Sequence, residues 1–589
     1  MTFWLSVLQL AGIYVILTAS YDVVVGQAGV LSMAHAAFFG VGAYAAALAM
    51  TKLHVTDIFV LIAIGAAAAA VINLPLALIS LRVRRDFFIV GSLGFATIFI
   101  AIVLNVGVLG RSDGLGSIPF FTLPGLTIGT VGTLALTTWV VALIVVALVW
   151  SFERSSLGLS IAATRDNERG AEALGLRPTS LRVLATIVGA ALAGVAGVLY
   201  VDFSQFITPE QFEFSTVALI VAMLGLGGIG RPLGYLIGPI ILAGLPALLE
   251  NFNVLSTSTF GPVNQMIYAA AMILTVRLFP GGLASLADLR FSRGSARRKP
   301  AHAPSPLPHA EVRARALRIA PTRPQSPATP PPIPTLNSAL GGVAAAVEPA
   351  LVCADIRKSF DEHAVHRGLS LTLRPGVVTG LLGPNGCGKS TLFDIICGFT
   401  RQDSGTITMG EIDLSRQPAW RRHRLGIART FQDLRLFEGV TVRKNVELAV
   451  LGVEPERRRE LVDAMLEEFG LERRAEVLPD ELGFGEQKLL SLLRAYAANA
   501  RVALLDEPAS GLTRHEIPRG LEFARRIAAG GAAVCLVEHN MEVIAEFADE
   551  VVFIAEGRIM ATGKPSEVLS DKRLADLYFG KAGARAAAA

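Results

Sequence analysis

A glycine-rich run in the second half of the sequence, GPNGCGKST, has the composition and spacing of a phosphate-binding loop. Its glycines let successive backbone N–H groups point at phosphate oxygens, and a helix-forming run follows, whose positive end faces the same anion. Lys389 supplies a cation for the terminal phosphates, and the Ser390 hydroxyl is the expected magnesium ligand. The residues expected to contact the phosphates are Gly383, Pro384, Asn385, Gly386, Cys387, Gly388, Lys389, Ser390 and Thr391.

Acidic and histidine side chains at two later strand ends complete a candidate hydrolytic site. The apolar run Val502 to Leu505 is followed by Asp506 and Glu507, so two carboxylates emerge together at a strand tip. We expect Asp506 to hold magnesium and Glu507 to orient and polarise the attacking water. A second buried strand ends shortly before His539, which can contact the terminal phosphate there.

The composition indicates that a large part of the chain lies in a membrane. Of its 589 residues, 52% are hydrophobic and only 17% are charged, and the mean hydropathy is +0.52; these values are unusual for a soluble protein. The net charge of +4 is small, and the basic residues follow apolar runs or lie in one linker, so we expect no nucleic-acid partner. The four cysteines lack metal-ligand spacing and are expected to be reduced thiols.

Nine apolar runs in the first half are candidates to span a bilayer, which takes roughly 17–25 residues. The seventh is short and glycine-rich, so eight spans is the alternative. The runs are Phe3 to Ala19, Val30 to Met50, Ile58 to Leu81, Phe87 to Leu109, Val131 to Trp150, Val183 to Val201, Thr216 to Ile229, Leu233 to Leu249 and Val263 to Phe279. We expect no cleaved signal peptide, because the N-terminus has no basic region.

The basic residues of the connecting loops predict the orientation of these spans. Lys and Arg are enriched in cytoplasmic loops, and arginines gather after the third, fifth, seventh and ninth runs. These four loops are consistent with one another as cytoplasmic. With nine spans, the N-terminus then lies on the opposite side.

Several segments of this half have a specific expected role. The polar run Thr164 to Gly175, TRDNERGAEALG, is predicted to be a short helix in a cytoplasmic loop that transmits force. The glycine-rich runs Gly225 to Gly234 and Gly40 to Ala47 either allow close helix packing or line a path. Asp22 and His35 lie near span ends, where we expect them to be solvated.

A proline- and arginine-rich stretch separates the two halves. Residues 291–349 include SARRKPAHAPSPLPHA and PTRPQSPATPPPIPT. Because proline cannot donate to a helix or a sheet, we expect a disordered tether. The expected domains are therefore a membrane domain at 1–290, this linker, a nucleotide-binding domain at 350–580 and a flexible tail at 581–589. The expected fold class is an α-helical polytopic membrane domain with eight or nine transmembrane helices, followed by an α/β P-loop domain.

Leu351 to Gly580 resembles the nucleotide-binding domain of an ABC transporter, and RTFQDLRLFEGVTVRKNV and DEPASGL resemble the ATPases of branched-chain amino-acid importers. The resemblance implies that Phe360 stacks on adenine and that Gln432 senses magnesium and the membrane domain. It places Gly483 and Gly485 in the signature sequence, LGFGEQ, which contacts ATP on an opposite subunit. It also implies that Glu507, His539 and Gln432 are catalytic, that Ser390, Gln432 and Asp506 serve magnesium, and that ATP and Mg²⁺ are the cofactors.

The first half resembles the permease of the same importer family. The segments that carry the resemblance are VGQAGVLSMAHAAFFGVGAYAAAL, SDGLGSIP, RDNERGAEALG and GLGGIGRPLGYLIGP. The resemblance implies that TRDNERGAEALG is the coupling helix, which docks on the ATPase near Gln432. One residue departs from the family pattern: Gly483 stands where the signature normally has serine, and this puts in doubt the composite site that the signature completes.

Together the two resemblances imply a fused permease and ATPase subunit of a binding-protein-dependent importer in a bacterial inner membrane. Its expected cargo is branched-chain or related amino acids; an importer of urea, short amides or aromatic acids is the alternative within transport. A membrane-tethered ATPase that gates or senses is the alternative of another class. The expected partners are a second permease and a second ABC ATPase, with a hetero-complex favoured over a homodimer, an extracytoplasmic solute-binding protein and the lipid bilayer.

Overall fold

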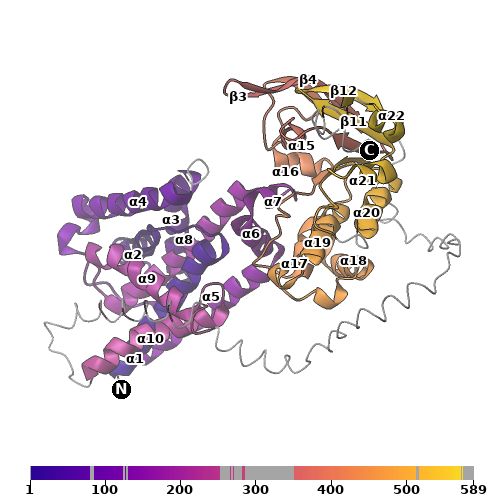
Figure 1. The fold of residues 1–589 in the computed structure, drawn as a ribbon. Coiled ribbons are helices and arrows are strands. Elements are labelled where there is room, and N and C mark those ends of the chain that lie inside the picture. Colours follow the sequence, from indigo (N-terminus) through magenta and orange to yellow (C-terminus); the bar gives the residue numbers. More distant parts are fainter. Residues whose placement is uncertain are drawn as a thin grey trace. The chain divides into compact units, whose positions relative to one another are not determined.

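The computed structural model of the chain describes residues 2–79, 85–123, 126–127, 130–251, 281–284, 350–512 and 517–571, and positions 266, 270, 273, 277, 573, 574 and 577. The chain divides into two compact units (Figure 1). The first unit comprises Met1–Glu153 with Arg182–Ile333, and the second comprises Arg154–Leu181 with Pro334–Ala589. Of the predicted ninth span, only positions 266, 270, 273 and 277 are described, and the predicted linker lies outside the described residues.

The first unit is built from long apolar helices. Its main helices are α1 (Thr2–Asp22), α2 (His35–Lys52), α3 (Ile58–Ile79), α4 (Arg85–Asn105), α5 (Val131–Arg154), α8 (Pro178–Ser204), α9 (Phe214–Gly227) and α10 (Pro232–Asn251). Short elements connect them: η1 (Val23–Gln27), η2 (Gly107–Leu109), η3 (Arg111–Asp113), β1 (Thr122–Leu123), β2 (Leu126–Thr127) and η4 (Pro209–Phe212). Within the described residues, six helices are long and apolar enough to cross a membrane.

The outer faces of α3, α4 and α5 carry large apolar side chains. Phe59 is 63% exposed, Phe87 68% and Leu136 67%. A soluble protein rarely exposes so much contiguous apolar surface, whereas lipid tails solvate such a surface. The prediction of a polytopic membrane domain is confirmed by these helices and their lipid-compatible faces.

Glycines bring some helix backbones of this unit into direct contact. A Cβ atom at Gly42 would lie 2.3 Å from the carbonyl oxygen of Gly194, and one at Gly227 would lie 2.0 Å from that of Gly234. No side chain fits at such distances. Close packing, one of the two roles expected of the glycine-rich runs, is therefore present at both.

The expectation that Asp22 and His35 are solvated is wrong. Asp22 is 0% exposed and His35 is 1% exposed. Asp22 accepts hydrogen bonds from the Gly230 amide at 2.8 Å and from the Tyr235 hydroxyl at 3.0 Å, while His35 Nε2 lies 2.8 Å from Ser20 Oγ. The structure buries both polar groups because neighbouring residues satisfy them. The second predicted span also begins later than expected, at His35, because α1 runs into the π-helical turn η1 and a non-helical stretch.

The second unit contains two sheets. The larger has the strand order β12-β11-β5-β10-β9-β8, and the smaller has the order β4-β3-β6-β7. The strands of the larger sheet are β5 (Val378–Leu382), β8 (Ile427–Arg429), β9 (Val502–Asp506), β10 (Ala533–Val537), β11 (Glu550–Ala555) and β12 (Arg558–Gly563); those of the smaller are β3 (Leu351–Phe360), β4 (His363–Leu373), β6 (Ser404–Met409) and β7 (Ile412–Asp413).

The centre of the larger sheet is parallel and fully buried. β10 pairs in parallel with both β5 and β9, and all five residues of each of these strands are buried. Such strands form continuous apolar runs, which is why the sequence predicted them. Their carboxyl ends meet at one edge, where ligands bind in open α/β sheets.

Helices surround this sheet. They are α15 (Lys389–Cys397), α16 (Ala419–Arg424), α17 (Val442–Ala449), α18 (Pro455–Glu468), α19 (Phe484–Ala497), α20 (Ile517–Ala529), α21 (Met541–Phe547) and α22 (Pro565–Leu569), with the short turns η5 (Glu472–Arg474) and η6 (Pro479–Glu481). Ile395 and Ile396 of α15 pack in one apolar core with Leu504. Leu521 of α20 and Leu490 of α19 pack in the other.

The loop segment Arg154–Leu181, which we call the docked segment, belongs to this second unit. It contains α6 (Ser156–Asp166) and α7 (Glu168–Glu172). The single helix expected over Thr164 to Gly175 is therefore interrupted. Asn167 has extended backbone angles, φ −147° and ψ 101°, and its side chain caps α7 by accepting from the Gly170 amide at 2.8 Å. Asparagine favours such caps over helix interiors.

Candidate functional site

The predicted phosphate-binding loop joins β5 to α15, as its strand–loop–helix order required. Gly383, Gly386 and Gly388 have φ values of 154°, 82° and 101°. A Cβ atom at Gly388 would lie 2.7 Å from His366 Cε1, so only glycine fits this position. The loop backbone thus wraps around a space next to the positive end of α15.

The lysine of this loop is buried and folds back onto the loop. Lys389 is 8% exposed, and its Nζ donates to the carbonyls of Gly383 at 2.7 Å and Pro384 at 3.1 Å. A phosphate oxygen offers the ammonium a charged acceptor in place of these neutral ones. The residue types and the glycine-dependent curl of the loop therefore fit a nucleotide phosphate.

The other predicted contact residues of the loop differ in exposure. Burial raises the pKa of the Cys387 thiol, and the charge of Lys389 opposes that rise. Cys387 is therefore a neutral thiol at neutral pH. Asn385, Gly386 and Ser390 are exposed, whereas Pro384, Gly388 and Thr391 are half-buried.

The structure brings the three predicted catalytic residues together. Glu507 Oε2 accepts from Gln432 Nε2 at 3.2 Å, and Glu507 Oε1 lies 2.9 Å from His539 Nε2. Glu507 follows β9, Gln432 follows β8 and His539 follows β10. Because β8, β9 and β10 are parallel neighbours, their following residues converge at one sheet edge.

The backbone of Glu507 has an unusual conformation. Its φ is +47°, in the left-handed region that non-glycine residues rarely adopt. The Glu507 amide donates to the carbonyl of Val537 at 2.9 Å, which fixes this turn to the end of β10. Strained backbone of this kind clusters at functional sites.

Asp506, the predicted magnesium ligand, is buried at the tip of β9. Its amide donates to Thr430 Oγ1 at 2.9 Å, and its Oδ2 accepts from Arg429 Nη2 at 3.3 Å. Burial raises the pKa of the Asp506 carboxyl, and the charge of Arg429 opposes the rise. The same guanidinium donates through Nη1 to Asp394 of α15.

Sequence reasoning missed Arg429 and Asp394. The available signal was an arginine that ends a short apolar strand pattern, Ile427–Arg429, three positions before Gln432. A charged residue at a buried strand end needs a partner. That partner could not be identified from spacing, because Asp394 and Asp506 lie far away in the sequence.

Phe360 and the signature glycines lie at accessible positions. Phe360 is the last residue of β3 and is 48% exposed. The centre of its ring lies 5.0 Å from Lys358 Nζ. Gly483 precedes α19 with an ordinary φ of −64°, and its amide donates to Glu486 Oε2 at 3.0 Å. Gly485 lies in the first turn of the same helix. The Gly483 carbonyl also accepts from the Gln487 amide at 2.9 Å, so both described hydrogen bonds of Gly483 are made with the start of α19.

The docked segment contacts the nucleotide-binding part of the unit through polar groups. The Gly439 amide donates to Asp166 Oδ2 at 2.7 Å, and Arg424 Nε donates to the carbonyl of Gly175 at 3.0 Å. The guanidinium of Arg177 lies 5.0 Å from the centre of the Trp420 ring. These contacts hold the segment against α16 and the loop that follows Gln432, near the predicted position.

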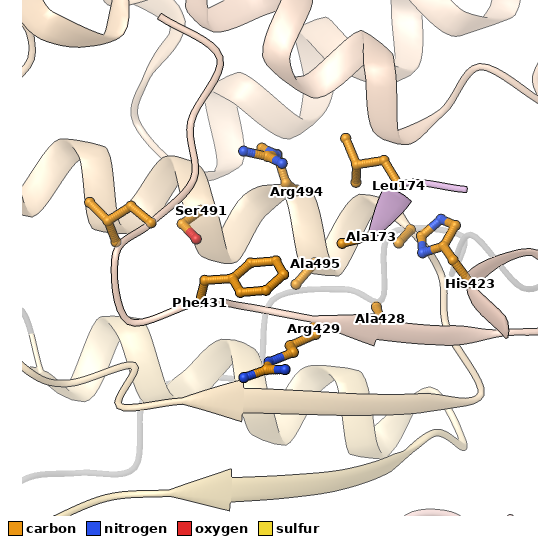
Figure 2. Close-up of a pocket in the computed structure, with 11 residues that line it drawn as sticks. Ala173, Leu174, His423, Ala428, Arg429, Phe431, Ser491, Arg494 and Ala495 are labelled. Carbon is orange, nitrogen blue, oxygen red and sulfur yellow. The ribbon is translucent and has the colours of Figure 1, made fainter. Parts of the chain in front are cut away.

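Apolar side chains complete this contact and leave a small cavity. Ala171 and Leu176 pack in one cluster with Phe437 and Val440. Beside it lies a cavity of ≈ 10 Å³ (Figure 2), space for about one water. Its lining comprises Ala173, Leu174, His423, Ala428, Arg429, Phe431, Leu434, Ser491, Arg494, Ala495 and Ala498.

Basic side chains around this cavity are strongly affected by burial. Desolvation lowers the pKa of His423 to about 4 and that of Arg494 to about 10. His423 is therefore neutral at neutral pH, while Arg494 keeps its charge. Arg494 donates to the carbonyl of Arg435 at 2.8 Å, and its guanidinium lies 4.5 Å from the centre of the Phe437 ring.

Comparison with known proteins identifies the family of both halves. Residues 3–276 match the family of branched-chain amino acid transport system permease components, and residues 366–510 match the ABC transporter family. The lipopolysaccharide export system ATP-binding protein LptB of Haemophilus influenzae is 32% identical over 235 residues, which are 39% of this chain and 97% of that protein. The chain belongs to the ABC transporter family, as a branched-chain-type permease fused to an ATP-binding subunit.

Two further similar proteins are ATP-binding proteins by name. The probable amino-acid import ATP-binding protein YxeO of Bacillus subtilis is 34% identical over 221 residues, covering 36% of this chain and 89% of that protein. A solved nucleotide-free ATP-binding cassette from an ABC transporter is 26% identical with a TM-score of 0.37, covering 40% of this chain and 100% of that chain. The permease match and the apolar helices of the first unit make the chain a membrane protein, and the ABC transporter match gives it an ATP-binding, ATP-hydrolysing transporter domain.

Proposed function

We propose that this chain is the fused permease and ATPase subunit of a binding-protein-dependent importer, which couples ATP hydrolysis to uptake of branched-chain or related amino acids. The observation that carries the proposal is the match of residues 3–276 to permease components of branched-chain amino acid transport systems. The contact of the docked segment with the loop after Gln432 supports it, because that segment is part of the permease half of the sequence.

The proposed roles of the site residues follow from their chemistry. Lys389 and the loop amides would bind the phosphates, and Phe360 would stack on adenine. Ser390, Asp506 and Gln432 would hold Mg²⁺, which neutralises the charge that develops on the transferred phosphoryl group. Glu507 would orient and polarise the attacking water, with Gln432 and His539 fixing its carboxylate through the contacts described above.

The signature residues act on a second subunit in this proposal. Gly483 and Gly485 would present their amides and the start of α19 to ATP bound by a partner ATPase. The complex then needs a second permease and a second ATPase. An extracytoplasmic binding protein would deliver the solute, and the complex would lie in a bacterial inner membrane with its ATPase in the cytoplasm.

Reconstituted uptake tests the proposal. The complex is purified with its partner subunits, placed in proteoliposomes and supplied with ATP and magnesium on the ATPase side and with binding protein and radiolabelled leucine on the other. We expect ATP-dependent leucine uptake, lost with Glu507→Gln in this chain and unaffected by Glu546→Gln, the same charge change at an exposed site on α21.

Competition identifies the cargo class. Excess unlabelled isoleucine should abolish uptake, whereas excess urea or benzoate should not. Inhibition by urea or benzoate alone would contradict the amino-acid assignment. ATP hydrolysis without uptake of any of these solutes would instead favour a gating or sensing ATPase.

A further inference from the structure

Within the second unit, Arg429 lies between the docked segment and the candidate nucleotide site. It is the last residue of β8, which pairs in parallel with β9, and it lies opposite Leu504, two residues before Asp506. Its side chain is only 5% exposed. A buried guanidinium keeps its charge and therefore needs compensating carboxylates or carbonyls.

The guanidinium connects the two parts of the candidate nucleotide site. Nη1 donates to Asp394, which lies in the helix that begins at Lys389. Nη2 donates to Asp506 at 3.3 Å. One side chain thus bridges the helix after the phosphate-binding loop and the carboxylate proposed to hold magnesium.

Aromatic rings hold this guanidinium in place. Its central carbon lies 4.9 Å from the centre of the Phe431 ring and 5.6 Å from that of Phe393. Such cation–π contacts favour one orientation of the planar group. A second arginine, Arg435, lies 4.8 Å from the centre of the Phe431 ring but pairs with Asp433 instead.

The same side chain also borders the docked segment. Arg429 and Ala173 line the cavity shown in Figure 2 and also a second cavity of ≈ 10 Å³ beside it, and Leu174 lines the first of these. Figure 2 shows the Arg429 guanidinium pointing away from Leu174 and Arg494. The arginine therefore has the docked segment beside it and the two carboxylates at its charged end.

We propose that Arg429 is a positioning residue that transmits the position of Ala173 and Leu174 in the docked segment to Asp506. This inference rests on the proposed function, since it takes Asp506 as the magnesium-holding carboxylate. A divalent cation and the guanidinium compete for the same carboxylate charge. A shift of the docked segment that repacks the Arg429 side chain changes how firmly its guanidinium holds Asp506, and thereby the magnesium requirement of nucleotide binding.

A double-mutant cycle tests the coupling. The full chain, purified with its partner subunits in nanodiscs, is titrated with magnesium at a fixed concentration of a fluorescent, non-hydrolysable ATP analogue. Arg429→Met removes the guanidinium that Asp394 and Asp506 share, so half-maximal binding should need about fivefold less magnesium, at the lower end of typical couplings between sites. Leu174→Ala should shift the magnesium midpoint in the wild-type background and leave it unchanged in Arg429→Met.

Two further variants make the test specific. Arg435→Met removes the other guanidinium that contacts the Phe431 ring, and it should leave the magnesium midpoint unchanged. Arg429→Lys keeps the buried charge but cannot span two carboxylates as a planar fork. It should shift the midpoint in the same direction by a smaller factor, and it replaces Arg429→Met if that variant does not fold by circular dichroism.

The outcomes separate this inference from the proposed function. The inference is wrong if Leu174→Ala shifts the magnesium midpoint equally with and without Arg429. It is also wrong if neither Arg429 variant shifts the midpoint. Neither result would contradict the proposed function. If the wild-type chain binds no nucleotide at any magnesium concentration, the ATP-driven function itself fails.

Discussion

Glu507 has a neighbour at each of its carboxylate oxygens. Gln432 donates to one oxygen, and His539 lies against the other. A carboxylate fixed in this way needs little reorganisation to orient a water molecule, which is how a positioned base contributes to catalysis. Lys389 has a different task, since its ammonium lies within the phosphate-binding loop.

Substitutions of Lys389 and Glu507 should therefore impair different steps, nucleotide binding and hydrolysis respectively. Lys389→Ala should weaken nucleotide binding, because the cation that faces the phosphates is lost. Glu507→Gln should leave binding intact and slow hydrolysis by on the order of 100-fold or more, the scale of losing a positioned catalytic group. Binding of a fluorescent nucleotide and release of phosphate by the purified complex measure the two effects. Near-normal hydrolysis with Glu507→Gln would refute the assignment.

Lys389, Glu507 and His539 were predicted from the sequence because the chemistry of phosphate transfer fixes their types and positions, whereas Gln432 was predicted from the family resemblance. The sequence could not predict that Gln432 and His539 touch opposite oxygens of Glu507, because that depends on the order β10-β9-β8 in the sheet. Arg429 was missed for the same reason. Its two carboxylate partners become neighbours only when α15 packs beside β8 and β9.

At the scale of elements, the strands that are buried on both faces were predicted best. β5, β9 and β10 are buried on both faces and form continuous apolar runs, so their bounds were nearly correct. Within the docked segment, Thr164 to Gly175 was predicted as one helix, because its polar residues are helix-compatible. The capping hydrogen bond from the Gly170 amide to Asn167, which ends one helix and starts the next, has a weak sequence signal.

His423 beside the docked segment makes the stability of the second unit depend on pH. Burial lowers its pKa to about 4, below the usual value of about 6.5. Between these values the unfolded chain binds more protons than the folded one, so stability rises with pH in this window and is lost on acidification. At pH values below both pKa values, the full contribution of this residue to the free energy of unfolding is on the order of 3 kcal/mol.

Thermal melts followed by circular dichroism between pH 4.5 and 7.5 check this expectation. His423→Gln should melt at a temperature that falls less on acidification than that of the wild type, because its side chain has no proton to gain. His363→Gln changes an exposed histidine on β4 and should keep the wild-type slope. Equal slopes for all three proteins would show that His423 does not titrate as described.

At the scale of the whole molecule, the topology remains a prediction from basic loops. Ser112 and Ser180 are both exposed, and they lie in loops predicted to face opposite sides of the membrane. The four native cysteines are buried free thiols, so they give little background labelling. In intact cells, a membrane-impermeant maleimide should label Ser112→Cys and not Ser180→Cys. The reverse pattern would contradict the predicted orientation.

The signature sequence predicts which subunits make up the complex. Each nucleotide site of an ABC dimer combines one subunit's phosphate-binding loop with the other's signature, so a defect in this chain's signature affects the partner's ATP. Gly483 lacks the hydroxyl that serine would offer to phosphate. Losing such a charge-assisted hydrogen bond costs roughly 1.5–3 kcal/mol, or about ten- to a hundredfold in rate. We therefore expect a hetero-complex, in which only one site is weak.

Gly483 can be changed without steric conflict. A Cβ atom there would approach only Glu486 Oε2, at 3.8 Å, and the backbone φ of −64° is ordinary. Gly483→Ser should therefore speed hydrolysis at the site that this signature completes, while Gly483→Ala, which adds the Cβ atom without the hydroxyl, should not. Combining each variant with a Glu507→Gln-type change in one ATPase at a time isolates the two sites. If this chain alone forms a dimer with full, binding-protein-stimulated hydrolysis and transport, the asymmetric arrangement is wrong, and the Gly485 amide with the start of α19 suffices for the phosphate.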